Sequence, residues 1–115
     1  MENKQIITKD ELMKMIKEYI TMGIEMQNTS IEYSTLRLFK NKNDFIFNYT
    51  IAIDHNHLID DRVILSKCAI KNIINYYYSD MGYNVLDYSI IDEENCNIEL
   101  IVKKVNSKVK SFGGK

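Results

Sequence analysis

Hydrophobic and polar residues along this chain follow two different periods, and the same order of periods occurs twice. In each half, a segment with apolar residues three and four positions apart is followed by two segments in which apolar and polar residues alternate. The first unit extends from about Thr8 to Asp54 and the second from about Asp60 to Val105. This order predicts an α+β domain of the type αββαββ, with a four-stranded antiparallel sheet and both helices on one face.

The first predicted helix begins at Thr8 and continues to about Gln27. Thr8 and Glu11 have the spacing of a capping box, in which each side chain bonds to the backbone N–H of the other residue. The apolar arc of this helix is wider than contact with one sheet requires, and it is rich in methionine, a residue that fills cores but also repacks against different partners. The surplus of apolar surface predicts self-association as a homodimer.

Strands are predicted on either side of a turn at residues 41–44. Alternation is strict from Phe45 to Ile53, and the preceding strand, Ile31 to Phe39, changes phase between Tyr33 and Leu36, which indicates a bulge.

The second predicted helix begins at Asp60 or Asp61, because aspartate is a preferred N-cap residue. It ends just before Gly82, which suits the left-handed position that follows a helix. The closing strands are predicted at about residues 84–92 and 97–105.

With 115 residues, 45% of them hydrophobic, the chain is long enough for one globular domain, expected at residues 1–106. Residues 100–115 hold five lysines and no acid, whereas the first 99 residues hold 10 basic and 16 acidic residues. Residues 107–115 are therefore expected to be a flexible basic tail that folding does not require.

Neither a secretory signal nor a long apolar segment is apparent, so the expected location is the cytoplasm, with Cys68 and Cys96 as free thiols and no membrane contact. Ile, Lys, Asn and Tyr make up 51 of the 115 residues. Their codons are rich in A and T, which favours an AT-rich source such as a phage or plasmid.

The densest cluster of metal-competent side chains is formed by His55, His57, Asp60 and Asp61. Imidazole nitrogen and carboxylate oxygen can bind a divalent ion. The alternative is a polar connector whose aspartates cap the second helix and favour its dipole.

A second candidate surface combines aromatic and basic residues late in the chain. Aromatic rings near lysines can stack nucleic-acid bases while the lysines contact phosphates. The alternative is that the tyrosines serve the core or an interface and that the lysines form a solubilising end. The residues concerned are Tyr76, Tyr78, Lys103, Lys104, Lys108 and Lys110.

The chain contains no glycine-rich phosphate loop, no nucleophile elbow and no paired CxxC. We therefore expect no catalysis and no cofactor. The leading hypothesis is a small protein-binding module, an inhibitor or accessory factor that occupies a partner's surface. A nucleic-acid-binding accessory protein and a metal-dependent enzyme at His55 and His57 are the second and third hypotheses. The order of elements is loosely similar to that of small dimeric secretion chaperones, although those proteins have an extra strand and their motifs are lacking here.

Overall fold

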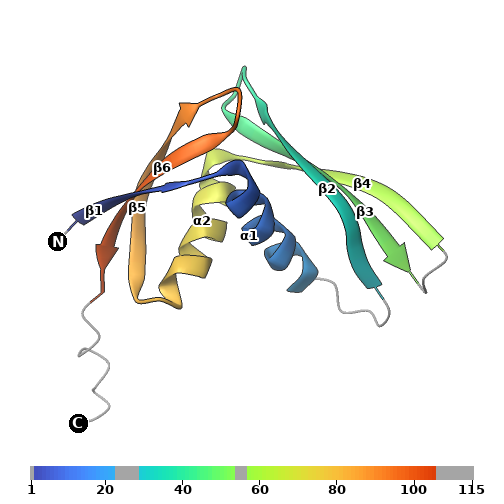
Figure 1. Cartoon of the computed structure of the whole chain (residues 1–115), viewed down its shortest axis with the longest axis horizontal. Helices are drawn as coiled ribbons and strands as arrows, with labels where there is room; N and C mark the ends of the chain where they lie inside the picture. The colour runs from blue at the N-terminus through green and yellow to red at the C-terminus, as the bar shows by residue number, and fades with distance from the viewer. Residues whose placement is uncertain (1, 23–28, 54–56, 106–115) are drawn as a thin grey trace, which may run out of the picture.

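The computed structural model describes residues 2–22, 29–53 and 57–105 (Figure 1). The expected basic tail and the end of the first predicted helix lie outside these ranges. The helices and strands of the chain are, in order, β1 (Glu2–Ile7), α1 (Lys9–Met22), β2 (Thr29–Phe39), β3 (Asp44–Ile53), β4 (His57–Leu65), α2 (Lys67–Ser79), β5 (Tyr83–Asp92) and β6 (Asn97–Lys104).

The strands form two separate sheets, and all their pairings are antiparallel. The terminal sheet has the order β1-β6-β5 and the central sheet has the order β2-β3-β4. The two sheets spread apart from a common ridge, and both helices lie in the space between them (Figure 1). The prediction of one four-stranded sheet with both helices on one face, in the order αββαββ, is therefore wrong, because the order is βαβββαββ and the strands form two sheets.

The second helix begins later than the sequence predicted. Residues Asp60 and Asp61 belong to β4, which pairs with β3 from Phe45↔Leu65 to Ile53↔His57 without a register shift. The N-cap of α2 is Ser66, whose hydroxyl accepts a hydrogen bond from the backbone N–H of Ala69 at 3.1 Å. The predicted aspartate caps are therefore wrong.

Strand β1 was not predicted, because most of its residues are polar and exposed. The strand pairs with β6 along its whole length, from Glu2↔Lys103 to Ile7↔Ile98. It adds an edge to a sheet that would otherwise be a hairpin, and such isolated hairpins are only marginally stable.

Several local signals lie where the sequence placed them. The N–H of Thr8 donates to Glu11 Oε1 at 2.8 Å and the N–H of Glu11 donates to Thr8 Oγ1 at 3.2 Å, which confirms the capping box. Gly82 follows α2 with a φ of 86°, and Asn43 in the first hairpin turn has a φ of 56°. The predicted bulge in β2 is displaced, since the register shift occurs between Ile31 and Tyr33.

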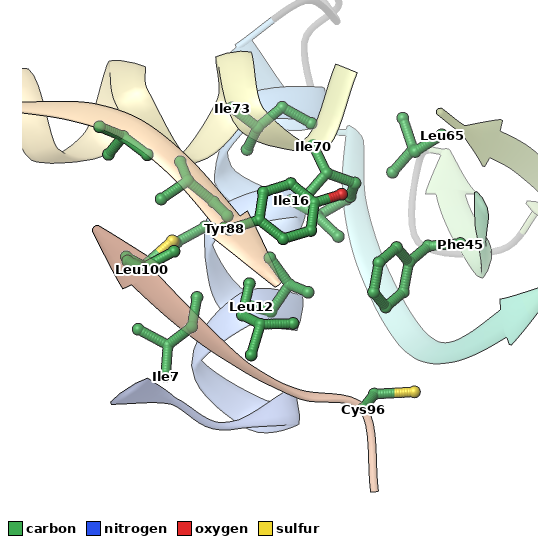
Figure 2. Packing of buried hydrophobic residues seen from close by; sticks show 14 of the residues in the cluster. Ile7, Leu12, Ile16, Phe45, Leu65, Ile70, Ile73, Tyr88, Cys96 and Leu100 are labelled. Atoms are coloured by element: carbon green, nitrogen blue, oxygen red, sulfur yellow. The ribbon is translucent and has the colours of Figure 1, made fainter. Parts of the chain in front are cut away.

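The hydrophobic core lies where the two sheets meet the helices. Leu12 and Ile16 of α1 and Ile70 of α2 are fully buried. Figure 2 shows Phe45 and Leu65 of the central sheet on one side of these residues and Leu100 of the terminal sheet on the other. The helices therefore join two sheets that share no hydrogen-bonded strand pair within the described ranges. Among the described residues, no helix has the length and apolar character needed to cross a membrane.

Candidate functional site

Asp60 and Asp61, two of the candidate metal ligands, do not converge on one site. Asp60 and Asp61 are successive residues of β4, so their side chains project from opposite faces of the central sheet. Asp60 accepts a hydrogen bond from Thr50 Oγ1 at 2.8 Å on one face, and Asp61 accepts one from Tyr49 Oη at 3.1 Å on the other. Within the ranges that the structure describes, no group of three or more histidine, cysteine and acidic side chains could hold a metal ion.

The predicted metal cluster also included His55 and His57. His57 is exposed at the start of β4, and His55 lies outside the described residues. Burial raises the pKa of Tyr49, and the hydrogen bond to Asp61 raises it further. This phenol is therefore a neutral hydrogen-bond donor to Asp61 at physiological pH.

The candidate nucleic-acid contacts are also dispersed. Tyr78 is buried, and its hydroxyl donates to Gln5 Oε1 at 3.1 Å. Tyr76 is exposed on a different side of α2. Lys103 and Lys104 are exposed at the end of β6, where successive side chains project in opposite directions. Lys108 and Lys110 lie outside the described residues.

The two cysteines have different environments. Cys68 is exposed near the start of α2. Cys96 is buried in the turn between β5 and β6, and this burial raises the pKa of its thiol. The Cys96 sulfur is therefore protonated at neutral pH and is a poor nucleophile.

The structure instead contains a groove between the C-terminal halves of the two helices, here called the α1–α2 groove. Its volume is about 380 Å³. Met15 and Ile73 are buried at its floor. The full lining is Met15, Glu18, Tyr19, Met22, Ile73, Tyr76, Tyr77, Asp80 and Met81.

Four large apolar side chains at the rim of this groove remain accessible to solvent. Tyr19, Met22, Tyr76 and Met81 are exposed by 44, 52, 52 and 53% respectively. They come from both helices, so they form one surface and are not isolated exposed residues. A contiguous surface of this kind indicates an interaction site more strongly than scattered apolar residues do.

Contacts across the groove hold its aromatic residues in place. The rings of Tyr19 and Tyr76 meet edge to face, with centroids 6.2 Å apart and an interplanar angle of 77°. The Tyr76 hydroxyl lies 3.6 Å from the sulfur of Met22, within range of a weak hydrogen bond. Both contacts join α1 to α2, so the two walls of the groove have a defined separation.

Acidic side chains give the groove its charge. Glu18 on α1 and Asp80 after α2 line it, and none of the lining residues that the structure describes is basic. A second hollow of about 370 Å³ adjoins the first and shares Met15, Tyr77 and Met81 with it. Because methionine adapts its shape readily, these shared side chains can adjust to what binds on either side.

The sequence contained part of the signal for this groove. The wide apolar arc of the first helix predicted surface that one sheet does not cover, and Tyr76 was among the candidate binding residues. Sequence periodicity could not show that Tyr19, Met22 and Met81 meet Tyr76, because that depends on how the two helices pack. Comparison with known proteins found no family model, no curated protein and no solved structure that matches this chain. The likeness to secretion chaperones rested on the predicted order of elements, which the structure contradicts.

Proposed function

We propose that this protein is a small protein-binding module that acts by occupying a partner's surface, and that the partner binds in the α1–α2 groove. The observation that carries this proposal is the half-exposed cluster of Tyr19, Met22, Tyr76 and Met81 above a buried apolar floor. The size and composition of the chain fit a cytoplasmic inhibitor or accessory factor from a mobile genetic element. The proposed role is binding, without a catalytic step.

Tyrosine and methionine suit this role for physical reasons. A tyrosine supplies a large contact area and loses few rotatable bonds when it is buried, and tyrosine is enriched among residues that dominate interface energies. The edge-to-face contact between Tyr19 and Tyr76 already restricts both rings, which lowers the entropy lost on binding. Met22 and Met81 allow the walls to fit a partner side chain closely.

The charge of the groove specifies the chemistry of the partner segment. Glu18 and Asp80 favour an apolar partner residue that is flanked by lysine or arginine. The same carboxylates oppose a phosphate backbone next to Tyr76, so this groove does not favour the nucleic-acid hypothesis. An amphipathic helix with basic residues beside its apolar face would meet both requirements.

Affinity capture with the tagged chain, followed by mass spectrometry, provides the partner for the test. The purified partner is then titrated by calorimetry against the wild-type chain, Tyr76→Ala and Tyr33→Ala. Tyr33 is the matched control because it is a tyrosine exposed by 63% on β2, outside the groove. Loss of an interface hot spot costs about 2 kcal/mol, so Tyr76→Ala should weaken binding roughly thirtyfold while Tyr33→Ala has little effect.

Circular dichroism establishes that both variants remain folded. A partner that binds Tyr76→Ala and the wild-type chain equally well would rule out the groove as the binding surface. If capture with the wild-type chain returns no protein that is enriched over the tag alone, the protein-binding proposal itself is contradicted.

A further inference from the structure

The exposed edges of the two sheets differ in how they are protected against pairing with another chain. Natural edge strands are commonly interrupted by bulges, shortened or supplied with lysine or proline. β2 and β5 each contain register shifts, and the six-residue β1 carries Lys4. β4 is nine residues long and contains no lysine, proline or register shift, and its charged residues Asp60, Asp61 and Arg62 are confined to its centre.

Exposed apolar side chains flank the charged centre of β4 on both sides. Leu58 and Ile64 are exposed by 63% and 52% on the outer face of the central sheet, and Ile59 by 40% on the inner face. Within the described ranges, β4 pairs only with β3, so its other edge has no strand beside it. In Figure 1 this edge lies at the margin of the molecule, and the chain enters α2 only at its Leu65 end.

We propose that β4 pairs with β4 of a second copy of this chain, antiparallel and centred on Asp61, so that the two central sheets form one six-stranded sheet. In this register Asp60 lies opposite Arg62 of the partner subunit, and symmetry repeats the pair on the other side. Leu58 lies opposite the partner's Ile64 on the same face. On the inner face Ile59 lies opposite the partner's Val63.

Other registers of the β4–β4 pair place less favourable residues opposite one another. Opposite residues of paired strands share a face, so the register can shift only in steps that keep outer residues opposite outer residues. The two nearest alternatives place Arg62 opposite the partner's Arg62, or Asp60 opposite the partner's Asp60. Like charges directly opposite one another destabilise a sheet. Only the register centred on Asp61 gives both opposite-charge pairs together with both apolar pairs.

This match is what identifies the occupant as a second copy. In this register the charged and apolar residues of β4 complement each other, whereas an unrelated strand would need charged and apolar residues at the same spacing. The register carries one cost, because Asp61 lies opposite the partner's Asp61. Replacing it with asparagine removes that repulsion, so Asp61→Asn should strengthen dimerisation severalfold.

A charge exchange measured by sedimentation velocity tests the pairing. The wild-type chain should approach twice its monomer mass of 13.5 kDa as concentration rises through the micromolar range. Asp60→Arg alone, or Arg62→Asp alone, should lower the association constant by about tenfold or more, because each places like charges opposite one another twice. The double exchange should restore association to within about threefold of the wild type.

Glu32→Arg is the matched control, since it makes the same change of charge on the opposite edge of the central sheet. It should leave the association constant unchanged, and circular dichroism confirms that every variant is folded. A chain that stays monomeric throughout the concentration series contradicts the proposal, including the case in which β4 binds a strand of a different protein. A dimer whose association constant is the same in the single variants, the double variant and the wild type also contradicts the proposal.

Disulfide crosslinking tests the register separately. In a Cys68→Ser background, Asp61→Cys should crosslink to itself under mild oxidation, because residue 61 of each copy lies at the two-fold axis. Val63→Cys should not, since the two copies of residue 63 would be about 14 Å apart along the strands. A mixture of Ile59→Cys and Val63→Cys chains should crosslink to each other. Crosslinking of Val63→Cys to itself would overturn the register. The groove plays no part in this dimer, so failure here leaves the proposed function unaffected.

Discussion

Tyr88 is the residue whose environment matches its chemistry least well. It is 2% exposed, and its hydroxyl is buried without a hydrogen-bond partner among the described residues. Burial raises the pKa of this phenol, and Asp44 and Asp87 raise it further. The Lys67 ammonium lies over the ring, 5.5 Å from its centroid, in a cation–π contact. This contact stabilises the ring but supplies no hydrogen-bond partner for the hydroxyl.

Tyr88→Phe should therefore increase the free energy of unfolding by about 1 kcal/mol, because a buried polar group without a partner carries a desolvation cost. Tyr78→Phe is the matched control. The Tyr78 hydroxyl donates to Gln5 Oε1 at 3.1 Å, so its removal should lower the free energy of unfolding by about 1 kcal/mol. Urea denaturation measures both values, and equal effects of the same sign would contradict this account of Tyr88.

At the scale of elements, strands with one buried face were predictable and strands without one were not. In β3, the odd-numbered residues Phe45 and Phe47 are buried while their neighbours are less so, which gives a clear period of two. β4 has large apolar residues exposed on both faces, and β1 has few apolar residues. Neither pattern alternates, because alternation arises only where one face of a strand packs on a core.

The misplaced start of the second helix has the same origin. Ile59, Val63 and Ile64 are spaced like a helix face, and Asp60 resembles an N-cap, yet three of these four residues are β-branched. The sequence also could not predict two sheets, since alternation identifies strands and leaves their partners open. The groove depends on the same unpredicted helix packing.

Ser66→Ala should lower the free energy of unfolding by about 1 kcal/mol, because it removes the side-chain acceptor for the N–H of Ala69. Ser89→Ala, an exposed serine of β5, provides the comparison and should have little effect. Thermal denaturation followed by circular dichroism measures both. If the two substitutions are equivalent, Ser66 does not cap α2.

At the scale of the whole molecule, the two sheets differ in how much of the chain each requires. The central sheet is a continuous meander from Thr29 to Leu65, whereas the terminal sheet needs β1 and β6, which are far apart in sequence. Both sheets pack on the same helices, so they share one core. Local pairings form with a smaller loss of entropy than distant ones, and the meander should therefore form first.

Stopped-flow kinetics can test this order of formation. Ile7→Val costs about 1 kcal/mol in the buried end of β1 and should mainly accelerate unfolding. Phe47→Leu, in the buried centre of the central sheet, should mainly slow folding. A folding rate that falls with Ile7→Val as much as stability does would show that the β1–β6 pairing forms early.

The pairing of β1 with β6 also matters during synthesis. The ribosome releases β1 first, and its hydrogen-bonding partner is made only after α1, the central sheet, α2 and β5. At about 5–20 residues per second, this delay lasts roughly 5–20 s. During that time the nascent chain exposes Ile6 and Ile7 beside unpaired backbone groups. Translation therefore leaves β1 open to chaperones or to neighbouring nascent chains until β6 is released.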